Sequence, residues 1–452
     1  MKTELPPKFI EMLRSLGDDF AGPLLAALTA PPQVSVRDNA LKGCAPAADA
    51  DVVPWCAQGR YLAERPLFAA DPAWHQGLYY VQEASSMIYT EAVRRIVGKY
   101  FDESPLRYLD ACAAPGGKTI SALEALRSDD FVVANELDRH RANILYENIA
   151  KYGASNVAVV RGDASRFGRL EEAFDIVAVD APCSGEGMMR KEPEAVAQWS
   201  EGLVASCAAT QRAILSDLWQ SLRPGGVLIY STCTFNRSEN EENIAFLADE
   251  FDAESVDLGL DCFEGVLKGI DTPHHCYRFT PGHIRGEGIF IAAVRKPGNG
   301  SHAQYKEKKF AACGEFVKSH IADADRFIEV EAGGRIEIRP RIHAAFIDKL
   351  ASTVTLLRGG LPVAEPKGRD LAPLHELALS ADLRPDSFAA FDLDLDAALR
   401  FLRGESLSDL PDGLPKGFVT PCYGARPLGF AKNIGRRANN LIPDHMRLRM
   451  GR

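Results

Sequence analysis

The pattern of apolar and polar positions divides the chain into a central region and two flanking regions. From about residue 76 to 296, short apolar runs alternate with segments of helical periodicity, a pattern typical of βαβ units with parallel strands. The predicted strands are 106–110, 131–135, 156–161, 175–180 and 226–230. We therefore expect an α/β fold in this region, with ligands bound at the carboxyl ends of the strands.

Both flanking regions carry shorter and more irregular elements. Residues 1–75 contain two helical segments and one strand-like segment: Pro7–Leu16, Ala21–Leu28 and Val34–Asn39. Residues 297–312 are polar and rich in turn formers, which indicates a linker. Residues 313–452 show strand patterns at 335–339 and 417–420 and helical patterns near 343–351 and 394–403. We expect a small α+β domain on each side of the central domain.

The segment 106–119 predicts a cofactor cradle. An apolar run ends at Asp110, small residues turn the chain at Pro115–Gly117, and Lys118 opens an amphipathic segment, which indicates strand, tight loop and helix. Glycines let the backbone approach a ligand closely, and the first turn of a helix offers unpaired N–H groups.

The spacing of the glycines and of the next acidic residue indicates which cofactor this segment binds. A phosphate-binding loop requires a glycine five positions before Gly117, where this chain has Cys112. A dinucleotide fingerprint requires three spaced glycines, and only Gly116 and Gly117 are present. Glu136 closes the next apolar run about 20 residues further on, where a carboxylate can bind a ribose diol. S-adenosylmethionine fits this arrangement best.

Composition sets the context for that site. With 452 residues, of which 46% are hydrophobic and 25% charged, the chain has the composition of an ordinary globular protein. It contains no apolar span of ~18 residues and no signal-peptide pattern at its start, so we expect a cytoplasmic protein without a membrane partner. Ten scattered cysteines without a Cys-x-x-Cys pair argue against a zinc site and a disulfide framework.

Charge is distributed unevenly. The net charge of −10 argues weakly against a nucleic-acid partner. After Thr420, however, the sequence contains seven basic residues and a single acidic residue, Asp444. They are Arg426, Lys432, Arg436, Arg437, Arg447, Arg449 and Arg452. This concentration favours an RNA contact.

Two cysteines follow predicted strand ends and have turn-forming or polar neighbours: Cys183 and Cys233. A thiolate beside a methyl donor suggests covalent activation of a poorly nucleophilic carbon, such as carbon 5 of a pyrimidine. Asp180 would hold a cytosine at its ring nitrogen and amino group. Plainer interpretations are core packing for each cysteine, helix capping for Glu136 and a turn role for Asp163 in place of an adenine contact.

Three segments together resemble the Nop/Sun family of RNA cytosine-5 methyltransferases. They are Asp110–Thr119 (DACAAPGGKT), Asp180–Gly185 (DAPCSG) and Ser231–Phe235 (STCTF). Tyr80–Met87 and Gly288–Lys296 are similar to the segment that enters the family's methyltransferase fold and to its final strand. Val36–Asn39, Pro427–Lys432 and Arg437–Pro443 resemble the N-terminal strand and the PUA-like C-terminal domain of the bacterial RsmF-like branch, whose target is 16S ribosomal RNA.

The resemblance implies a Rossmann-like class I methyltransferase core and a role for each motif. It implies that Cys233 attacks the base, that Cys183 helps to release the product and that Asp180 binds the base next to the cofactor. It places Glu136 on the ribose and Asp163 near the adenine. The loop around the methionine part comprises Ala113, Ala114, Pro115, Gly116, Gly117 and Lys118.

Some alternatives stay open. DNA cytosine methyltransferases attack with the cysteine of a Pro-Cys motif, so Cys183 is the rival nucleophile. Pro281-Gly-His283 stands where this branch is expected to have Pro-His, which argues against a role for His283. We expect a monomeric, metal-free enzyme acting on ribosomal RNA. The alternatives are tRNA or another RNA, DNA, a small metabolite, and a noncatalytic RNA-binding ribosome assembly factor.

Overall fold

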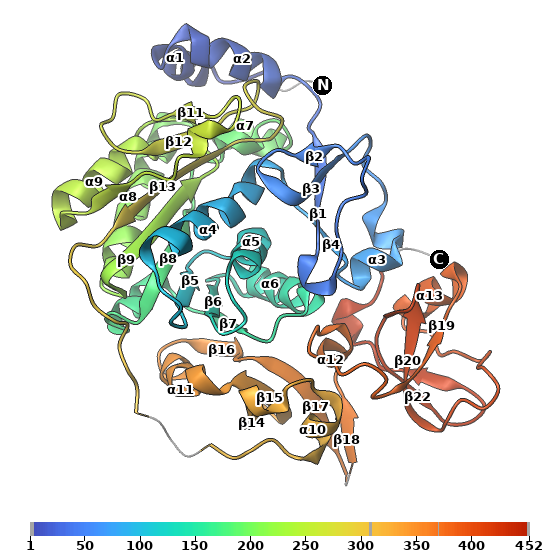
Figure 1. The fold of residues 1–452 in the computed structure, drawn as a ribbon. Helices are drawn as coiled ribbons and strands as arrows, with labels where there is room; N and C mark the ends of the chain where they lie inside the picture. Colours follow the sequence, from blue (N-terminus) through green and yellow to red (C-terminus); the bar gives the residue numbers. More distant parts are fainter. Residues whose placement is uncertain (1–3, 307–309, 369, 450–452) are drawn as a thin grey trace.

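The computed structural model describes residues 4–306, 310–368 and 370–449 (Figure 1). Its centre is a ten-stranded sheet with helices on both faces, and smaller sheets from the two ends of the chain flank it (Figure 1). The predicted α/β class of the central region is confirmed.

The middle of the central sheet is parallel. Its adjacent strands are β7 (Val157–Arg161), β6 (Phe131–Asn135), β5 (Arg107–Asp110), β8 (Phe174–Asp180) and β9 (Leu222–Thr232). These strands correspond to the five predicted ones, and β9 is longer than expected at both ends. Almost all of their residues are buried, as expected for a parallel sheet that is covered on both faces.

Antiparallel strands complete one side of the sheet. They are β13 (Ile289–Arg295), β12 (Cys276–Phe279), β11 (Leu267–Lys268) and β10 (Glu254–Val256). One group of helices packs on each face: α4 (Ile88–Tyr100), α5 (Gly117–Ala125) and α6 (Arg139–Tyr152) on one, α8 (Glu201–Trp219) and α9 (Glu241–Phe251) on the other.

The N-terminal part has two short helices, α1 (Pro7–Ser15) and α2 (Asp18–Leu28), which pack on α7 (Pro193–Gln198) beside the central domain. Its four-stranded sheet contains β2 (Val52–Val53), β3 (Cys56–Leu62), β1 (Val34–Asp38) and β4 (Tyr79–Val81), in that order. Both predicted helices and the strand are confirmed. Helix α2 begins three residues earlier than expected, because Asp18 and Asp19 extend its first turn, where acidic side chains suit the helix dipole.

The C-terminal part contains two sheets. The first comprises β14 (Phe327–Ala332), β15 (Arg335–Pro340), β17 (Leu361–Lys367) and β18 (Asp370–Pro373), with α10 (Glu315–His320) and α12 (His375–Leu379) beside it. The second comprises β19 (Ala389–Asp392), β20 (Gly417–Tyr423), β21 (Arg426–Pro427), β22 (Ala431–Asn433) and β23 (Ala438–Asn440), with α13 (Leu395–Leu402). The predicted strands 335–339 and 417–420 are thus β15 and β20.

A segment between these sheets returns to the central domain. Strand β16 (Thr355–Arg358) pairs antiparallel with β7 at the edge of the central sheet, and α11 (Ala344–Ala351) packs on the same face as α8. The buried Arg358 guanidinium donates to the Ala154 carbonyl at 2.6 Å. Residues 344–358 therefore belong structurally to the central domain.

Within the described ranges, no helix has the length and apolar character needed to cross a membrane. The same ranges contain no group of three or more His, Cys, Asp or Glu side chains arranged to hold a metal ion.

Candidate active site

The predicted cradle forms at the end of β5. Asp110 is buried, and burial raises its pKa to about 7, while Thr119 at the start of α5 donates a hydrogen bond to it at 2.6 Å. Gly116 has a φ of 117°, a left-handed conformation that favours glycine, and an added Cβ would lie 3.2 Å from Leu145. The loop is therefore specific for glycine at this position.

Helix α6 holds the cradle from outside. Arg141 donates to the Ala114 carbonyl and Asn148 to the Pro115 carbonyl, each at 2.8 Å. At the base of the loop, the Asn135 amide donates to the carbonyls of Ala111 and Gly162 at 2.9 and 3.0 Å. These bonds tie together the carboxyl ends of β5, β6 and β7.

A pocket of about 920 Å³ opens at these strand ends. Its volume lies within the ~300–1,000 Å³ range of small-molecule sites. The structure brings together five side chains that the sequence selected from four separate segments. They are Glu136, Asp163, Asp180, Cys183 and Cys233.

Glu136 and Asp163 line this pocket at the ends of β6 and β7. Glu136 accepts from the Asp138 N–H at 3.0 Å and pairs with Arg141 at 3.3 Å. It is not the cap of α6, because Asp138 fills that position by accepting from the Arg141 N–H at 2.8 Å. Asp163 does cap a short turn through Ser165, and these hydrogen bonds lower its pKa, so its carboxylate is charged.

The pocket fits S-adenosylmethionine. A glycine-specific loop lies at the helix start, and carboxylates lie at the ends of β6 and β7. The Oδ1 atom of Asn135, whose residue lines the pocket, is buried without a hydrogen-bond partner among the described residues. Such a group can accept a hydrogen bond from a ligand.

Lys118 lies between the glycine loop and Asp180. Its ammonium donates to Asp180 Oδ2 at 2.8 Å, while Ser231 donates to Asp180 Oδ1 at 2.8 Å. Although burial lowers it, the attraction of Asp180 raises the pKa of Lys118 overall. The charged lysine therefore fixes Asp180 from the side of the cradle, and the Tyr89 hydroxyl supports Ser231 at 2.7 Å.

The side chains of Cys183 and Cys233 lie next to each other beyond the ends of β8 and β9. These strands are parallel neighbours with Asp180 opposite Ser231, so the loops that follow them start side by side. The Sγ atoms of Cys183 and Cys233 lie 3.3 Å apart, and both residues are free thiols. The hydrogen bond with Cys233, burial and the charge of Glu239 raise the pKa of Cys183 well above its ordinary value.

Glu239 joins the two cysteine loops from behind. Its buried carboxylate accepts from the N–H and the hydroxyl of Ser184 at 3.0 and 2.5 Å, from Gln211 at 2.8 Å and from Asn236 at 2.7 Å. Burial raises the pKa of Glu239, and no cation is paired with it among the described residues.

A second buried carboxylate extends this network. Glu186 accepts from the backbone N–H groups of Phe235 and Asn236 at 2.6 and 3.0 Å and from the Trp199 indole at 3.0 Å. Neither carboxylate was predicted from the sequence as part of the site. Glu239 lies in a polar run after Cys233, and such a run ordinarily predicts a solvated surface.

His283 lies apart from this constellation. It is not among the residues that line the pocket, and its ring stacks on Phe20 with centroids 6.4 Å apart. The geometry of the pocket therefore gives His283 no role in this site.

The strand order, the glycine loop after β5 and the carboxylate after β6 define a class I S-adenosylmethionine-dependent methyltransferase. Family models match three stretches: 16S rRNA methyltransferase RsmB/F at 102–295, the N-terminal domain of 16S rRNA methyltransferase RsmF at 5–84, and the methyltransferase RsmF PUA domain at 388–448. The chain belongs to the RsmF family of methyltransferases.

Relatives match almost the whole length. The Ribosomal RNA small subunit methyltransferase F of Serratia proteamaculans is 33% identical, with 98% of this chain and 96% of the relative covered. The protein of the same name from Escherichia coli O7:K1 is 34% identical, with 95% and 92% covered. The three family models leave residues 85–101 and 296–387 unmatched, and the relatives align across these stretches as well.

Solved structures confirm the fold. NSun6 from Pyrococcus horikoshii, solved with SFG, aligns with a TM-score of 0.54 at 22% identity, over 66% of this chain and all of that one. A methyltransferase homologue from the same organism aligns with a TM-score of 0.51 at 27% identity, over 65% of this chain and all of that one.

Proposed function

We propose that this chain methylates carbon 5 of a cytosine in 16S ribosomal RNA through a covalent bond between Cys233 and the base. The observation that carries the proposal is the pair of thiols 3.3 Å apart, in the same pocket as Asp180 and Glu136. Relatives that cover nearly the whole chain are named as methyltransferases of small-subunit ribosomal RNA, which supports the choice of RNA.

Residues of this chain activate carbon 5 of the cytosine, which is otherwise a poor nucleophile. The Cys233 thiolate forms a bond to carbon 6, and electron density moves to carbon 5, which then takes the methyl group. S-adenosylmethionine supplies that methyl group when bound. Loss of the proton at carbon 5 and cleavage of the sulfur–carbon 6 bond restore the aromatic ring and free the thiol.

Asp180 orients the cytosine during these steps. Its carboxylate faces the pocket and is held by Lys118 and Ser231, so it can accept hydrogen bonds from the amino group of the base and from the ring nitrogen in the protonated form that addition of the thiolate favours. A held base leaves carbon 6 beside Cys233.

We assign the attack to Cys233 and a part in product release to Cys183, in line with the family resemblance of their two motifs. The hydrogen bond between the two sulfurs, burial and the charge of Glu239 raise the pKa of Cys183, so this thiol can donate a proton when the bond between Cys233 and the base breaks.

The flanking domains position the RNA. A target base has to leave its stack, which costs a few kcal/mol. RNA contacts from residues 1–75 and from the C-terminal region 313–452 offset that cost. The linker 297–312 joins this C-terminal region to the central domain. We propose that the enzyme acts as a monomer. We place its action in the cytoplasm, where its proposed substrate is assembled into ribosomes.

Transfer of labelled methyl groups tests the proposal. We expect the purified protein to label carbon 5 of cytosine in 16S ribosomal RNA, and to leave tRNA and DNA unlabelled. Labelling of tRNA or DNA alone would contradict the proposed substrate, and binding of RNA without any transfer would favour a noncatalytic assembly factor.

A further inference from the structure

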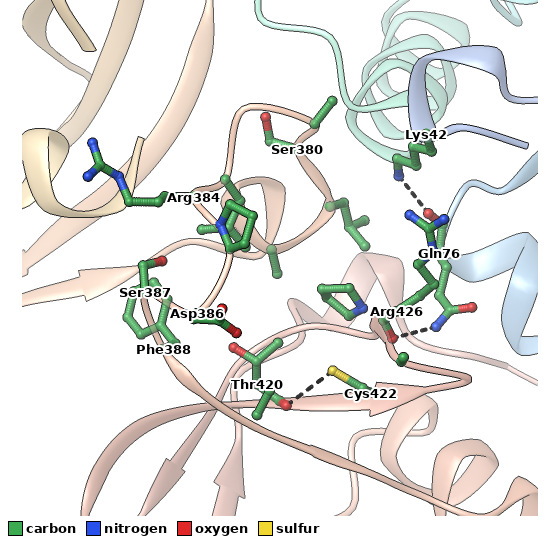
Figure 2. Close-up of a pocket in the computed structure, with 18 of the residues that line it drawn as sticks. Lys42, Gln76, Ser380, Arg384, Asp386, Ser387, Phe388, Thr420, Cys422 and Arg426 are labelled. Carbon is green, nitrogen blue, oxygen red and sulfur yellow. Dashed lines mark hydrogen bonds between the residues drawn. The ribbon is translucent and has the colours of Figure 1, made fainter. Parts of the chain in front are cut away.

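A second pocket lies where the N-terminal sheet, α12 and the last sheet meet (Figure 2). Its volume is about 420 Å³, within the ~300–1,000 Å³ range of small-molecule sites. Its walls come from Lys42 and Gln76, from the loop 378–388, and from β20 and the following turn as far as Pro427. It shares no lining residue with the active site among the described residues.

The pocket attracts anions. Three basic side chains line it, Lys42, Arg384 and Arg426, against the single carboxylate of Asp386 (Figure 2). Burial lowers the pKa of Lys42 to about 7, so the two guanidinium groups supply most of the positive charge. The Lys42 amino group donates to the carbonyls of Gln76 and Lys151, both at 2.6 Å, and its charged form has a third N–H for an anion. The exposed Arg426 guanidinium has no hydrogen-bond or ion-pair partner in the described part of the chain.

The remaining walls suit a flat ring with polar edges. Leu379, Pro385, Phe388 and Pro427 provide apolar surface. Hydroxyl groups come from Ser380, Ser387 and Thr420 (Figure 2). The Ser387 hydroxyl is buried and has no hydrogen-bond partner within the described ranges, a costly state that a ligand group can relieve. An anion, a flat ring and several hydrogen-bonding groups are combined in a nucleotide.

We propose that this pocket binds one unpaired nucleotide of the RNA substrate, with its phosphate at Lys42 and Arg426 and its base against the apolar wall. The choice of RNA rests on the proposed function. Helix α6 connects the two sites: its first turn carries Arg141 in the active site, and its last turn carries Lys151, which holds Lys42.

This connection sets the spacing between the two sites. The 14 residues of α6 span about 21 Å at 1.5 Å per residue. Extended single-stranded RNA of a few nucleotides reaches from one site to the other. A nucleotide held in the second pocket therefore helps to select which cytosine enters the first.

Two substitutions test the pocket in the full-length protein. Ala390→Trp fills it from an exposed position on β19, and Arg426→Glu reverses its charge. The matched control is Arg94→Glu on α4, whose side chain forms a surface ion pair with Glu91 and no other polar contact with the described residues. The dissociation constant of a short single-stranded RNA of mixed sequence is measured by fluorescence anisotropy, with cytidine monophosphate and inorganic phosphate as competitors.

We expect each pocket variant to weaken RNA binding about tenfold, the loss typical of one stacked base, while the control stays within twofold of the wild type. Arg426→Glu should also reduce the slope of affinity against salt by about one. Cytidine monophosphate should compete better than phosphate.

Unchanged affinity in both pocket variants, with unaltered thermal unfolding, would overturn the inference. A loss of RNA affinity in Arg426→Glu alone would also overturn the inference, and so would equal competition by phosphate and cytidine monophosphate. Each of these results would show that the pocket contacts a phosphate but binds no base. The experiments distinguish failure of the pocket proposal from failure of the proposed function. A wild type that methylates 16S ribosomal RNA while its variants bind RNA normally refutes the pocket alone, and a wild type that transfers no methyl group refutes the function.

Discussion

The Sγ atom of Cys183 lies 3.3 Å from the Sγ atom of Cys233, although the two residues are 50 positions apart in the chain. That separation is longer than a disulfide bond of about 2.05 Å, so the two sulfurs are neighbours and not covalently joined. Both thiols can therefore reach one base held by Asp180. The distance follows from the parallel pairing of β8 and β9 and from the carboxylates behind the loops.

Glu239→Gln should change the ionisation of Cys183. The negative charge of Glu239 contributes to the raised pKa of this thiol, and a neutral amide removes that contribution. A raised pKa keeps the thiol neutral as pH increases, so in the wild type the alkylation of Cys183 by iodoacetamide should reach its midpoint above pH 9. In the variant the midpoint should move to lower pH, as followed by mass spectrometry of the Cys183 peptide.

Ser184→Ala is the matched control for that variant. It removes one hydrogen bond to Glu239 but keeps the charge, so it should shift the midpoint less than Glu239→Gln does. Equal shifts in the two variants, or no shift in either, would show that Glu239 acts on folding alone.

Lys118→Met should separate catalysis from cofactor binding. The ammonium holds Asp180 at 2.8 Å, and loss of this contact lets the carboxylate move. Displacement of a positioning group by about 1 Å costs roughly a hundredfold in rate, so kcat should fall by about that factor. The Kd for S-adenosylmethionine, measured by calorimetry, should stay within threefold. A large loss of cofactor affinity with kcat preserved would assign Lys118 to the cofactor instead.

Glu136→Ala should weaken cofactor binding. A hydrogen bond to a charged group contributes about 1.5–3 kcal/mol, so the Kd for S-adenosylmethionine should rise roughly 10- to 100-fold. Asp138→Asn keeps a side chain that can cap α6 and should leave the Kd unchanged. If Glu136→Ala binds the cofactor as tightly as the wild type, the ribose contact is elsewhere.

Truncation should have different effects at two positions. Deletion of 310–452 removes β16 and α11, whose buried Phe346, Ile347 and Leu350 pack on the central sheet. At about 1.5–3 kcal/mol per buried side chain, the loss of roughly 5–9 kcal/mol is comparable to the total stability of a domain. Deletion of 388–452 spares these contacts, so its melting temperature should fall less while its RNA binding loses salt dependence. Similar melting temperatures for both truncations would contradict this account.

The contrast between β8 and β16 shows what the sequence could predict. Strand β8 has a buried run of Ile and Val that ends in Asp180, and both its period and its end are visible in one sequence. Strand β16 is short, and its pairing with β7 depends on a partner nearly 200 residues away. Local patterning carries no information about such a pairing.

The site shows the same division. The motif residues Asp180, Cys183 and Cys233 stand beside recognisable turns, so they could be selected in advance. Glu239 could not, because its burial depends on Ser184 and Gln211 from other elements. The contact between Lys118 and Asp180 likewise depends on the tertiary fold.

Trapping of a covalent complex tests the central claim most directly. Full-length wild type, Cys183→Ala and Cys233→Ala are incubated with 16S ribosomal RNA and S-adenosylmethionine, and adducts are separated by denaturing electrophoresis. We predict that Cys183→Ala accumulates an RNA adduct that resists denaturation, because Cys233 still attacks and release is impaired. Cys233→Ala should form no adduct and no 5-methylcytosine. An adduct in Cys233→Ala, or full methylation by that variant, would contradict the assignment of Cys233 as the nucleophile.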